Sequence, residues 1–439
     1  MTNHTIFALA SAPGRGGVAV FRLSGPRAGE VLTALTGRAL PPARMAMRVR
    51  LAHGGEDIDD GLALYFPAPR SFTGEEVVEL HVHGGRAVAA ALSDALVELG
   101  LRPAEPGEFS KRAFLGGKLD LTRAEAIADL VDAETSAQRR QALRQLDGGL
   151  ARLADGWRSG IIRALALMEA VIDFSDEGVP DGLVDTVGGL VTALISDMDR
   201  HLGEGRRGER LRDGIHIAIL GAPNAGKSSL LNRLAGREAA IVSATAGTTR
   251  DVIEIHLDLQ GWPVVVADTA GLRDAAEDIE AEGIRRALAK AEAADLKLAV
   301  FDASQSELDG PTLSMVDGDA LVVLNKMDLA GPLPDQINGR PVLAVSARNG
   351  HGLDRLLAVL TEEVSNRFAT ASAPALTRAR HRSAVEDCVA LLRRFDPQAE
   401  IELAAEDLRQ AAGAIGRITG RVEVDELLDV VFREFCIGK

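Results

Sequence analysis

The sequence has little cysteine and few aromatic residues. Two cysteines, Cys388 and Cys436, are too few for a disulfide framework and favour a reducing compartment, so we expect a cytoplasmic protein. Aromatic residues make up 3% of the chain, which leaves little material for a platform that stacks single-stranded nucleic acid. No apolar run approaches the roughly 20 residues that cross a bilayer, and residues 1–17 lack the pattern of a secretory signal. We therefore expect no membrane partner.

The chain also has a deficit of positive charge. Its 49 basic and 64 acidic residues give a net charge of −15, which argues against a protein that coats nucleic acid indiscriminately, although a local basic patch could still bind RNA. The length of 439 residues allows roughly three domains. An apolar fraction of 46% is ordinary for globular proteins, so each domain can have its own core.

Residues 1–118 predict a small α+β domain. This part is rich in glycine and proline, and it has short strand-like runs at Val18–Leu23, Gly61–Phe66 and Val77–Val82.

Residues 119–213 predict the first part of a helical domain. An apolar stripe at steps of three or four runs over Leu143–Ile172, with a possible break at Gly148-Gly149. Thr122 and Glu125 fit a capping box at a helix start. Two stretches are predicted loops: 174–183 and 203–214.

Residues 214–370 predict an inserted α/β domain. Apolar runs alternate with helical stretches there, a pattern typical of a mostly parallel sheet. The runs are Ile215–Leu220, Val264–Ala267, Lys297–Phe301, Leu321–Leu324 and Val342–Val345. Residues 371–439 are the second part of the helical domain. After a connection near 371–377, the tail is predicted to be helical over 378–435, with Leu428, Val431 and Phe435 on one face, so the two helical segments could pack as one bundle.

The segment Gly221–Ser228 matches the phosphate-binding loop pattern G-x-x-x-x-G-K-S without a departure. It follows a predicted strand and precedes a predicted helix, which is the context that the motif needs. The glycines let backbone N–H groups face a β-phosphate, Lys227 supplies charge to the β- and γ-phosphates, and the Ser228 hydroxyl can bind Mg²⁺.

Further motifs end successive predicted strands. Asp268-Thr-Ala-Gly271 can hold the Mg²⁺ shell and meet the γ-phosphate. Asn325-Lys-Met-Asp328 carries a carboxylate that can accept the two N–H donors of guanine, which adenine lacks. A backbone amide of Ser346-Ala-Arg348 could meet the guanine O6. Each motif alone could be a plain strand-end turn, but the ordered set indicates a GTP-binding domain.

A first switch is predicted at Gly247-Thr-Thr-Arg250, where Thr249 is a candidate second hydroxyl ligand of Mg²⁺. Leu272 stands where small GTPases carry the glutamine that orients the attacking water. Another water-positioning group is therefore needed, and spacing alone does not choose among the acidic candidates Asp274, Glu277, Asp278, Glu280 and Glu282.

Motifs along nearly the whole chain resemble the MnmE (TrmE) family of tRNA-modification GTPases, within the TrmE–Era–Der-like GTPases. They are Pro13-Gly-Arg-Gly-Gly17, Ser71-Phe-Thr-Gly-Glu75, His83-Gly-Gly85, Pro106-Gly-Glu-Phe109, Lys118-Leu-Asp-Leu121, Ala124-Glu-Ala-Ile-Ala128, Gly247-Thr-Thr-Arg-Asp251 and the terminal Cys436-Ile-Gly-Lys439.

The resemblance implies a GTPase that acts with the flavoprotein MnmG (GidA), as a heterotetramer, on carbon 5 of the wobble uridine of certain tRNAs. The product would carry an aminomethyl or carboxymethylaminomethyl group. It also implies a homodimer through the N-terminal domain, which would be folate-binding-like and hold 5-formyltetrahydrofolate or a related folate. The implied folate contacts fall on Arg22, Glu79, Lys118 and Lys439.

For the GTPase reaction, the resemblance implies a K⁺ ion in the place of an arginine finger. Its ligands would be Asn224, Ser243, Thr245 and Thr248, and Glu280 would orient the attacking water. Glu280 and Lys227 are the predicted catalytic residues. The full predicted GTP-binding set is Asn224, Ala225, Gly226, Lys227, Ser228, Ser229, Ser243, Ala244, Thr245, Ala246, Gly247, Thr248, Thr249, Asp268, Thr269, Ala270, Gly271, Asn325, Lys326, Asp328, Ser346, Ala347 and Arg348. Arg348 replaces the more usual lysine, a change that we expect to be tolerated.

Two other functions share parts of this sequence pattern. A ribosome-assembly GTPase of the Era or Der type would share the G-domain motifs but should carry an RNA-binding KH-like module, with a GXXG loop, after the G domain. Gly416–Gly420 has one residue too many for that loop, and the tail is predicted to be helical. A scaffold with a vestigial GTPase is contradicted by the intact phosphate-binding loop. Cys436 could be a nucleophile, although the sequence shows no activating base.

Overall fold

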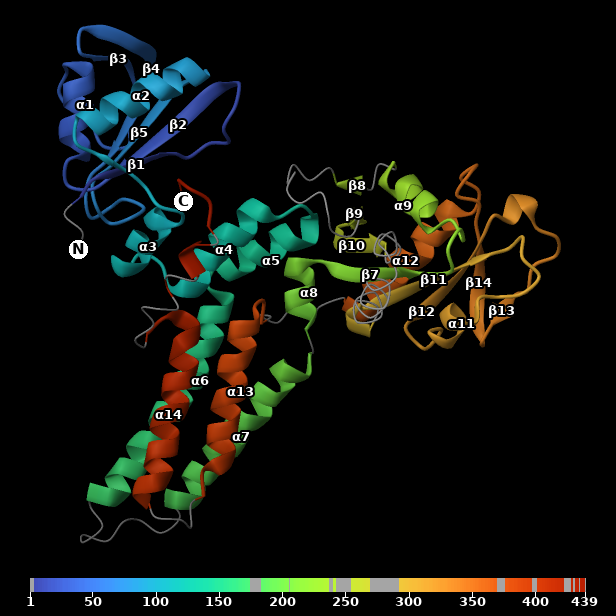
Figure 1. Ribbon diagram of the computed structural model, residues 1–439. Helices are drawn as coiled ribbons and strands as arrows, with labels where there is room; N and C mark the ends of the chain where they lie inside the picture. Colours follow the sequence, from blue (N-terminus) through green and yellow to red (C-terminus); the bar gives the residue numbers. More distant parts are fainter. Residues whose placement is uncertain are drawn as a thin grey trace, which may run out of the picture. The chain divides into compact units, whose positions relative to one another are not determined.

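Figure 1 shows the protein as a computed structural model. The described residues are 4–173, 183–204, 206–236, 240–241, 254–268, 292–368, 376–396, 401–421, 428, 431–433 and 435–438. Contacts divide the chain into two units, here called unit 1 (1–128, 145–194 and 387–439) and unit 2 (129–144 and 195–386).

The N-terminal part of unit 1 is built on a six-stranded sheet with the order β3-β4-β5-β2-β1-β6. Its strands are β1 (Ile6–Leu9), β2 (Gly16–Ser24), β3 (Met47–His53), β4 (Glu56–Phe66), β5 (Val77–Gly84) and β6 (Arg102–Pro103). Every pairing is antiparallel except that of β1 with β6. The three predicted strands are confirmed within β2, β4 and β5, whereas β1, β3 and β6 were not predicted.

Helices α1 (Ala28–Thr36) and α2 (Arg86–Glu98) lie on one face of this sheet (Figure 1). Their buried residues, such as Leu32 and Leu96, share a core with Phe21 and Leu80 of the central strands. A third helix, α3 (Glu108–Leu115), follows β6. The predicted α+β character of this part is therefore confirmed.

The helices of unit 1 include α6 (Gly149–Asp173) and α14 (Ile401–Thr419), and α4 (Leu121–Asp132) begins in unit 1 and ends in unit 2. Helices α6 and α14 come from opposite ends of the chain and pack along each other (Figure 1). Ion pairs join them or their flanks: Arg409 to Glu169 at 2.7 Å and Arg421 to Asp155 at 2.9 Å. The predicted packing of the two helical segments is present in this pair.

Two local predictions in the helical part are wrong, and one is confirmed. The cap of α4 is Asp120, whose carboxylate accepts the N–H of Arg123 at 3.0 Å, whereas Thr122 and Glu125 lie inside the helix and are buried. The stretch predicted as a loop at 203–214 contains helix α8 (Arg207–Asp213). The break predicted at Gly148-Gly149 does separate α5 (Ser136–Leu146) from α6.

Helices α7 (Leu183–Gly203) and α13 (Ala379–Arg394) each cross a boundary between the units. At the end of the chain, Leu428, Val431 and Phe435 are buried and share a small core with Leu121 and Phe432, as the predicted apolar face requires. None of the described helices has the length and apolar character that a membrane crossing requires.

Unit 2 contains an eight-stranded sheet with the order β13-β14-β12-β11-β7-β10-β9-β8. The strands are β7 (Ile215–Leu220), β8 (Ala240–Ile241), β9 (Glu254–Leu259), β10 (Trp262–Asp268), β11 (Leu296–Asp302), β12 (Ala320–Asn325), β13 (Gln336–Ile337) and β14 (Arg340–Ala344). All five predicted strands are present and pair in parallel, and antiparallel strands flank them at both edges.

Helices α9 (Lys227–Ala235) and α12 (Leu353–Phe368) contribute to the core of this sheet, and a short helix α11 (Gly310–Ser314) follows β11. Parallel strands place their carboxyl ends at one edge of a sheet, where ligands of α/β folds bind. The predicted nucleotide motifs follow the carboxyl ends of β7, β12 and β14, so the topology brings them to one edge.

Candidate nucleotide-binding site

The loop between β7 and α9 depends on two close backbone approaches. A Cβ atom at Gly221 would overlap the carbonyl oxygen of Val300 on β11. At Gly226, where φ is +90°, a Cβ would overlap the side-chain nitrogen of Asn325. Only glycine fits these positions, and Gly226 stands directly before α9, where the first N–H groups of a helix can bind phosphate.

Lys227 lies folded over this loop. Its ammonium group donates to the carbonyl oxygens of Gly221 at 2.9 Å and Ala222 at 2.8 Å, and the residue is buried. A positive charge next to the backbone N–H groups of such a loop makes a binding site for phosphate oxygens. The geometry therefore fits the predicted contact of Lys227 with a nucleotide's phosphates.

Asn325 joins two loops of the site. Its Nδ2 donates to the carbonyl of Ala225 at 2.8 Å, and its Oδ1 accepts the N–H of Ala347 at 3.0 Å. The side chain is fully buried. Asn325 therefore fixes the phosphate-binding loop against the loop that contains Ser346 and Arg348.

Lys326 is held by a carboxylate that the sequence analysis did not single out. Its Nζ lies 2.6 Å from Oδ2 of Asp302 at the end of β11, and its backbone is in the left-handed region with φ at +64°. Burial would raise the pKa of Asp302, but hydrogen bonds from Lys326 and Ser304 outweigh it and lower that pKa. One signal was available in the sequence: Asp302 directly follows the predicted strand Lys297–Phe301, as Asn325 follows the predicted strand Leu321–Leu324.

Asp328 presents its carboxylate to solvent beside this junction. A hydrogen bond from the buried Ser346 hydroxyl lowers the pKa of Asp328, so the carboxylate is ionised at neutral pH. An ionised carboxylate accepts hydrogen bonds only, which matches the paired donors on the Watson–Crick edge of guanine.

A second unpredicted residue is Arg233 of α9. It donates to the carbonyl oxygens of Ala347 at 3.2 Å and Arg348 at 2.9 Å. These bonds fix the Ser346–Arg348 loop to the helix that follows the phosphate-binding loop.

The structure thus brings together the members of the predicted GTP set that follow β7, β12 and β14: Asn224, Ala225, Gly226, Lys227, Ser228, Ser229, Asn325, Lys326, Asp328, Ser346, Ala347 and Arg348. Asp268 ends β10, as predicted, but its side chain lies outside what the structure describes. Also outside the described residues are Ser243, Ala244, Thr245, Ala246, Gly247, Thr248, Thr249, Thr269, Ala270, Gly271, Glu280 and Lys439.

A separate polar cluster lies in the N-terminal part of unit 1. Arg22 of β2 contacts Glu79 of β5 through Nε at 3.0 Å and Nη2 at 2.8 Å. The guanidinium lies 5.4 Å from the ring centroid of Phe72 and 5.9 Å from that of Phe109. Two of the four predicted folate contacts therefore meet across a strand pair, backed by aromatic rings.

The other parts of this predicted site lie on neighbouring loops. A Cβ at Gly74 would contact the Lys118 side chain at 3.1 Å, so Lys118 lies along the 71–75 loop. A Cβ at Gly438 would lie 2.6 Å from the carbonyl oxygen of Leu9, so the C-terminal tail lies against the end of β1. Cys436, in this tail, is exposed.

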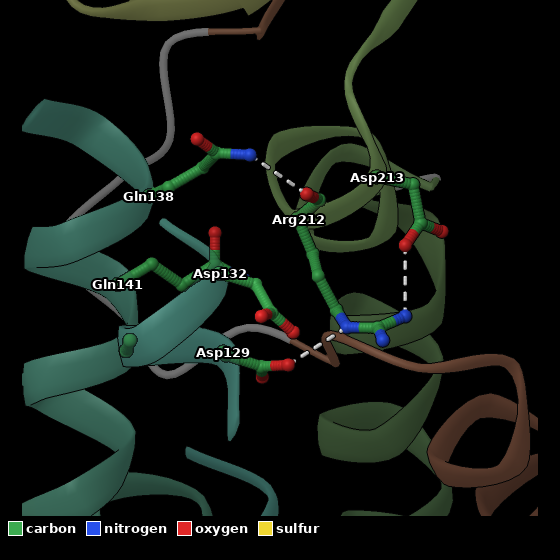
Figure 2. Close-up of a pocket in the computed structure, with 7 residues that line it drawn as sticks. Asp129, Asp132, Gln138, Gln141, Arg212 and Asp213 are labelled. Atoms are coloured by element: carbon green, nitrogen blue, oxygen red, sulfur yellow. Dashed lines mark hydrogen bonds and ion pairs between the residues drawn. The ribbon is translucent and has the colours of Figure 1, made fainter. Parts of the chain in front are cut away.

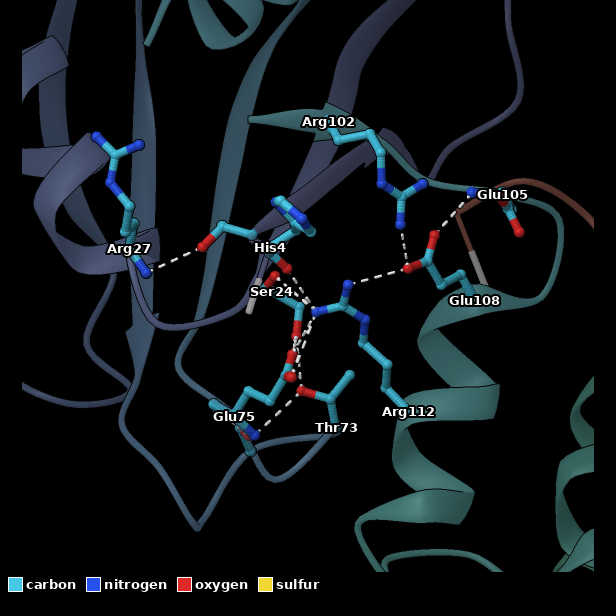
Figure 3. Close-up of polar contacts among 11 residues, drawn as sticks. His4, Ser24, Arg27, Thr73, Glu75, Arg102, Glu105, Glu108 and Arg112 are labelled. Carbon is cyan, nitrogen blue, oxygen red and sulfur yellow. Dashed lines mark hydrogen bonds and ion pairs between the residues drawn. The ribbon is translucent and has the colours of Figure 1, made fainter. Parts of the chain in front are cut away.

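Figure 3 shows an ion network that connects the loops around this cluster. The buried guanidinium of Arg112 lies 2.9 Å from Glu108 and 3.0 Å from Glu75, and it donates to the carbonyl oxygen of His4 at 3.0 Å. Arg102 reaches the same Glu108 oxygen at 2.6 Å. The motifs that end in Glu75 and Phe109 thus meet at Arg112, which the sequence analysis did not single out.

The matches to known protein families cover residues of both units. The family model described as MnmE helical domain matches residues 121–436, and the one described as GTP-binding protein TrmE N-terminus matches residues 5–118. Among solved structures, the G domain of the T. maritima FeoB iron transporter covers 36% of this chain and 99% of its own at 26% identity, but its TM-score of 0.27 is too low to support a conclusion.

Curated relatives match at full length. The protein named tRNA modification GTPase MnmE from Paramagnetospirillum magneticum (strain ATCC 700264 / AMB-1) is 68% identical over 440 residues, covering 100% of both chains. Its namesake from Parvibaculum lavamentivorans (strain DS-1 / DSM 13023 / NCIMB 13966) is 56% identical, covering 99% of this chain and 100% of its own. On these matches, the chain belongs to the MnmE family of tRNA modification GTPases.

Proposed function

We propose that this protein is a GTPase that acts in tRNA modification. The observation that carries the proposal is the junction at Asn325, which joins a phosphate-binding loop to a loop beside an ionised, exposed Asp328. A phosphate cradle at one end and a guanine-selective acceptor at the other define a site for a guanine nucleotide. The family's full-length relatives carry the same activity in their name.

For hydrolysis, the loop amides and Lys227 would hold the phosphates, while Ser228 and Thr249 would bind Mg²⁺ near Asp268. The metal would neutralise charge that develops between the β- and γ-phosphates. Glu280 is proposed as the residue that orients the attacking water.

We further propose K⁺ as the second cation of the site, with Asn224, Ser243, Thr245 and Thr248 as ligands. Asn224 supports this assignment, because it is exposed and none of its side-chain atoms has a hydrogen-bond partner among the described residues. GTP turnover should rise when Na⁺ is replaced by K⁺ at equal ionic strength, and Asn224→Ala should remove that rise. Equal turnover of the native protein in both salts would contradict the K⁺ assignment.

The N-terminal part of unit 1 is proposed to bind a folate such as 5-formyltetrahydrofolate, in a folate-binding-like fold. Arg22 and Glu79 are proposed to hold the folate, with Lys118 and the terminal Lys439. Arg22 and Glu79 form an ion pair, and the Arg22 guanidinium lies over the ring of Phe72. Charged groups beside an aromatic ring suit a flat, polar heterocycle. The exposed Cys436 remains a candidate nucleophile in this region.

The same part is proposed to form a homodimer. On β2, Ala19 and Phe21 face the helices, so Val20 lies on the opposite face, and Val18 lies in an irregular stretch of the pairing with β5. Val18 is 60% exposed there, and Leu62, which lies on β4 in register with His81, is 42% exposed. An uncovered apolar sheet face is a surface that a second copy can bury.

The finer reaction is proposed from the family. With MnmG, in a heterotetramer, the protein would install an aminomethyl or carboxymethylaminomethyl group at carbon 5 of a wobble uridine, in the cytoplasm. We retain the domain division 1–118, 119–213, 214–370 and 371–439 as part of this proposal. The ribosome-assembly alternative is disfavoured, because the described residues after α12 form helices α13 and α14, and Gly416 lies inside α14.

Two measurements test the function. The purified protein should hydrolyse GTP and not ATP, and loss of this preference would contradict the guanine site. Cells that lack the protein should lose the modified wobble nucleosides in mass spectrometry of bulk tRNA. Intact wobble nucleosides together with unassembled ribosomal subunits would support the assembly alternative instead.

A further inference from the structure

Helix α5 of unit 2 has a composition opposite to that of the whole chain. Within a protein of net charge −15, residues 136–146 read S-A-Q-R-R-Q-A-L-R-Q-L, with three arginines and no acidic residue. Arg139, Arg140 and Arg144 are all exposed. No acidic residue on this helix balances the positive charge of its arginines, so the charge calls for an explanation.

The inner face of α5 is docked without using these arginines. Gln138 donates to the carbonyl oxygen of Arg212 at 2.9 Å, and Gln141 donates to that of Gly208 at 3.0 Å. Figure 2 shows both glutamines directed from α5 toward α8, around a cavity of about 80 Å³ whose other lining residues include Asp129 and Asp132. Neutral amides therefore anchor the helix, and the nearby carboxylates lie on its inner side.

The N-terminal end of α5 is held by the sheet. The N–H of Ala137 donates to the carbonyl oxygen of Gly261 in the β9–β10 turn at 3.1 Å, and Glu134 lies 3.1 Å from His256 of β9. The acidic residue that precedes the helix is thus already engaged. A helix fixed at its end and along its inner face presents its outer side chains from a rigid base.

The outer face carries the uncompensated charge. Arg140 contacts only the Ser136 hydroxyl, at 3.1 Å, and no carboxylate of the described residues pairs with Arg139, Arg140 or Arg144. Several exposed arginines elsewhere in this protein do have such partners, among them Arg48 with Asp60, Arg409 with Glu169, and Arg421 with Asp155. Arg140 and Arg144 are four residues apart, a spacing at which like charges on a helix repel.

Helix α8 extends this charge. The bond from Gln141 to Gly208 places the first turn of α8 beside α5, and that turn adds the exposed residues Arg206 and Arg207. Arg206 has only a distant acidic neighbour, Glu209 at 3.8 Å. We call the five exposed residues Arg139, Arg140, Arg144, Arg206 and Arg207 the arginine surface.

We propose that the arginine surface binds the phosphate backbone of tRNA, an inference that rests on the proposed function in tRNA modification. Guanidinium groups suit phosphates because they can donate two parallel hydrogen bonds and stay charged. An acidic protein partner is disfavoured, since a protein interface needs aromatic or apolar anchors. Helix α5 has no aromatic residue, and its single exposed large apolar residue is Leu143, at 43%. Contacts of this kind position an RNA without reading its sequence.

The test compares the full-length protein with the triple variant R139Q/R140Q/R144Q in tRNA binding over a series of salt concentrations. Each lost phosphate contact should reduce the slope of log affinity against log salt by about 0.7–0.9, so the triple variant should lose about 2. Affinity at the lowest salt should fall by roughly tenfold or more. R139K/R140K/R144K should keep most of the slope.

A matched control removes the same charge elsewhere. R48Q/R50Q/R409Q also removes three exposed arginines, each of which is ion-paired, and should bind tRNA like the native protein. GDP affinity and thermal unfolding should be unchanged in all variants, which separates a lost contact from lost folding. Should the triple variant misfold, R144Q alone should still reduce the slope by about 0.7–0.9.

Three results would overturn the inference. They are a native slope in the triple variant, an equal loss in the control variant, or retained tRNA binding with loss of binding to the flavoprotein partner, which would assign the surface to a protein. If the native protein hydrolyses GTP but binds no tRNA at any salt concentration, the proposed function itself fails together with this inference.

Discussion

At Asn325, one buried side chain holds the two loops of the nucleotide site at a fixed separation. Both polar atoms of its side-chain amide are hydrogen-bonded within the protein, one to Ala225 and the other to Ala347. The side chain is therefore a spacer between the two loops. Glycine at position 226 is required by the same side chain, because a Cβ there would overlap Nδ2 of Asn325. We therefore expect Asn325 to act on the nucleotide through the loops that it fixes.

We expect Asn325→Ala to lower both stability and guanine nucleotide affinity. The substitution leaves a buried carbonyl and a buried N–H without partners, which costs about 1–3 kcal/mol for each unsatisfied group. Thermal unfolding and a GDP titration would measure the two effects. Asn366→Ala, at an exposed asparagine of α12, is the matched control. An Asn325→Ala protein with native GDP affinity would contradict the spacer role.

The ion network around Glu108 in the N-terminal part predicts how the stability of the protein depends on pH. Burial would raise the pKa of Glu108, but hydrogen bonds from the backbone of Glu105 and from Arg102 and Arg112 lower it overall. A carboxyl whose pKa is lowered on folding stabilises the protein above its unfolded pKa, near 4.3. That contribution is lost as the pH falls through the lower, folded value.

Glu108→Gln should therefore destabilise the protein most near neutral pH. The difference in unfolding free energy between native protein and variant should shrink as the pH falls below about 4. Urea unfolding at a series of pH values would measure this difference. The exposed Glu98→Gln, which pairs only with His53 at 2.9 Å, should show a much smaller difference. A pH-independent cost for Glu108→Gln would contradict the role of its charge.

At the scale of elements, the β9–β10 hairpin connects the helical and nucleotide-binding parts of unit 2. β9 follows the predicted first switch, and β10 ends at Asp268. The turn between them adopts positive φ at Gln260 (+53°) and Gly261 (+97°), and it receives the first turn of α5. The contact of α5 with this turn is therefore a direct link between that helix and two strands, one of which follows the predicted first switch and the other of which ends at Asp268.

We expect Gly261→Ala to weaken this link. A Cβ at position 261 would lie 2.6 Å from the Ser136 hydroxyl, in addition to the strain of positive φ. Gly55→Ala, in the β3–β4 turn at φ +87° with nothing within 4 Å, carries the strain alone, about 1–2 kcal/mol. The Gly261 variant should unfold at lower temperature than the Gly55 variant and lose hydrogen-exchange protection at Ala137. Equal losses would show that the contact with Ser136 adds nothing.

At the scale of the whole molecule, the exposed sheet face of the N-terminal part predicts assembly. Leu62 lies on the face away from α1 and α2, and Val18 is exposed on β2. We expect Val18→Glu with Leu62→Glu to shift the protein from dimer to monomer in analytical ultracentrifugation, because each buried carboxylate would require desolvation. Val97→Glu, which changes a 51% exposed residue of α2, should leave the dimer intact. A native protein that sediments as a monomer would contradict the proposed dimer.

Several predictions from sequence came close because their signals are local. The strands of unit 2 are continuous apolar runs, and the phosphate-binding loop is marked by glycines whose backbone positions no other residue fits. Helix α8 was missed because R-G-E-R-L-R-D has no apolar period. Ion pairs and the glutamines of α5 stabilise it instead, as in the 3.0 Å pair of Arg382 with Glu209. The cap of α4 was misplaced because Asp120 and Thr122 both fit capping patterns, and burial of Thr122 decides between them.

The sequence by itself determined the chemistry of the nucleotide site, since glycine, lysine and carboxylate positions in a short loop define what that loop can bind. Only the tertiary structure decided which residues far apart in the sequence contact each other. Arg112 meets Glu75 across 37 positions, Asp302 holds Lys326 across 24, and the arginines of α5 are left outward because glutamines dock its other face. Such pairings depend on how whole elements pack against one another, and no local pattern of residues encodes that.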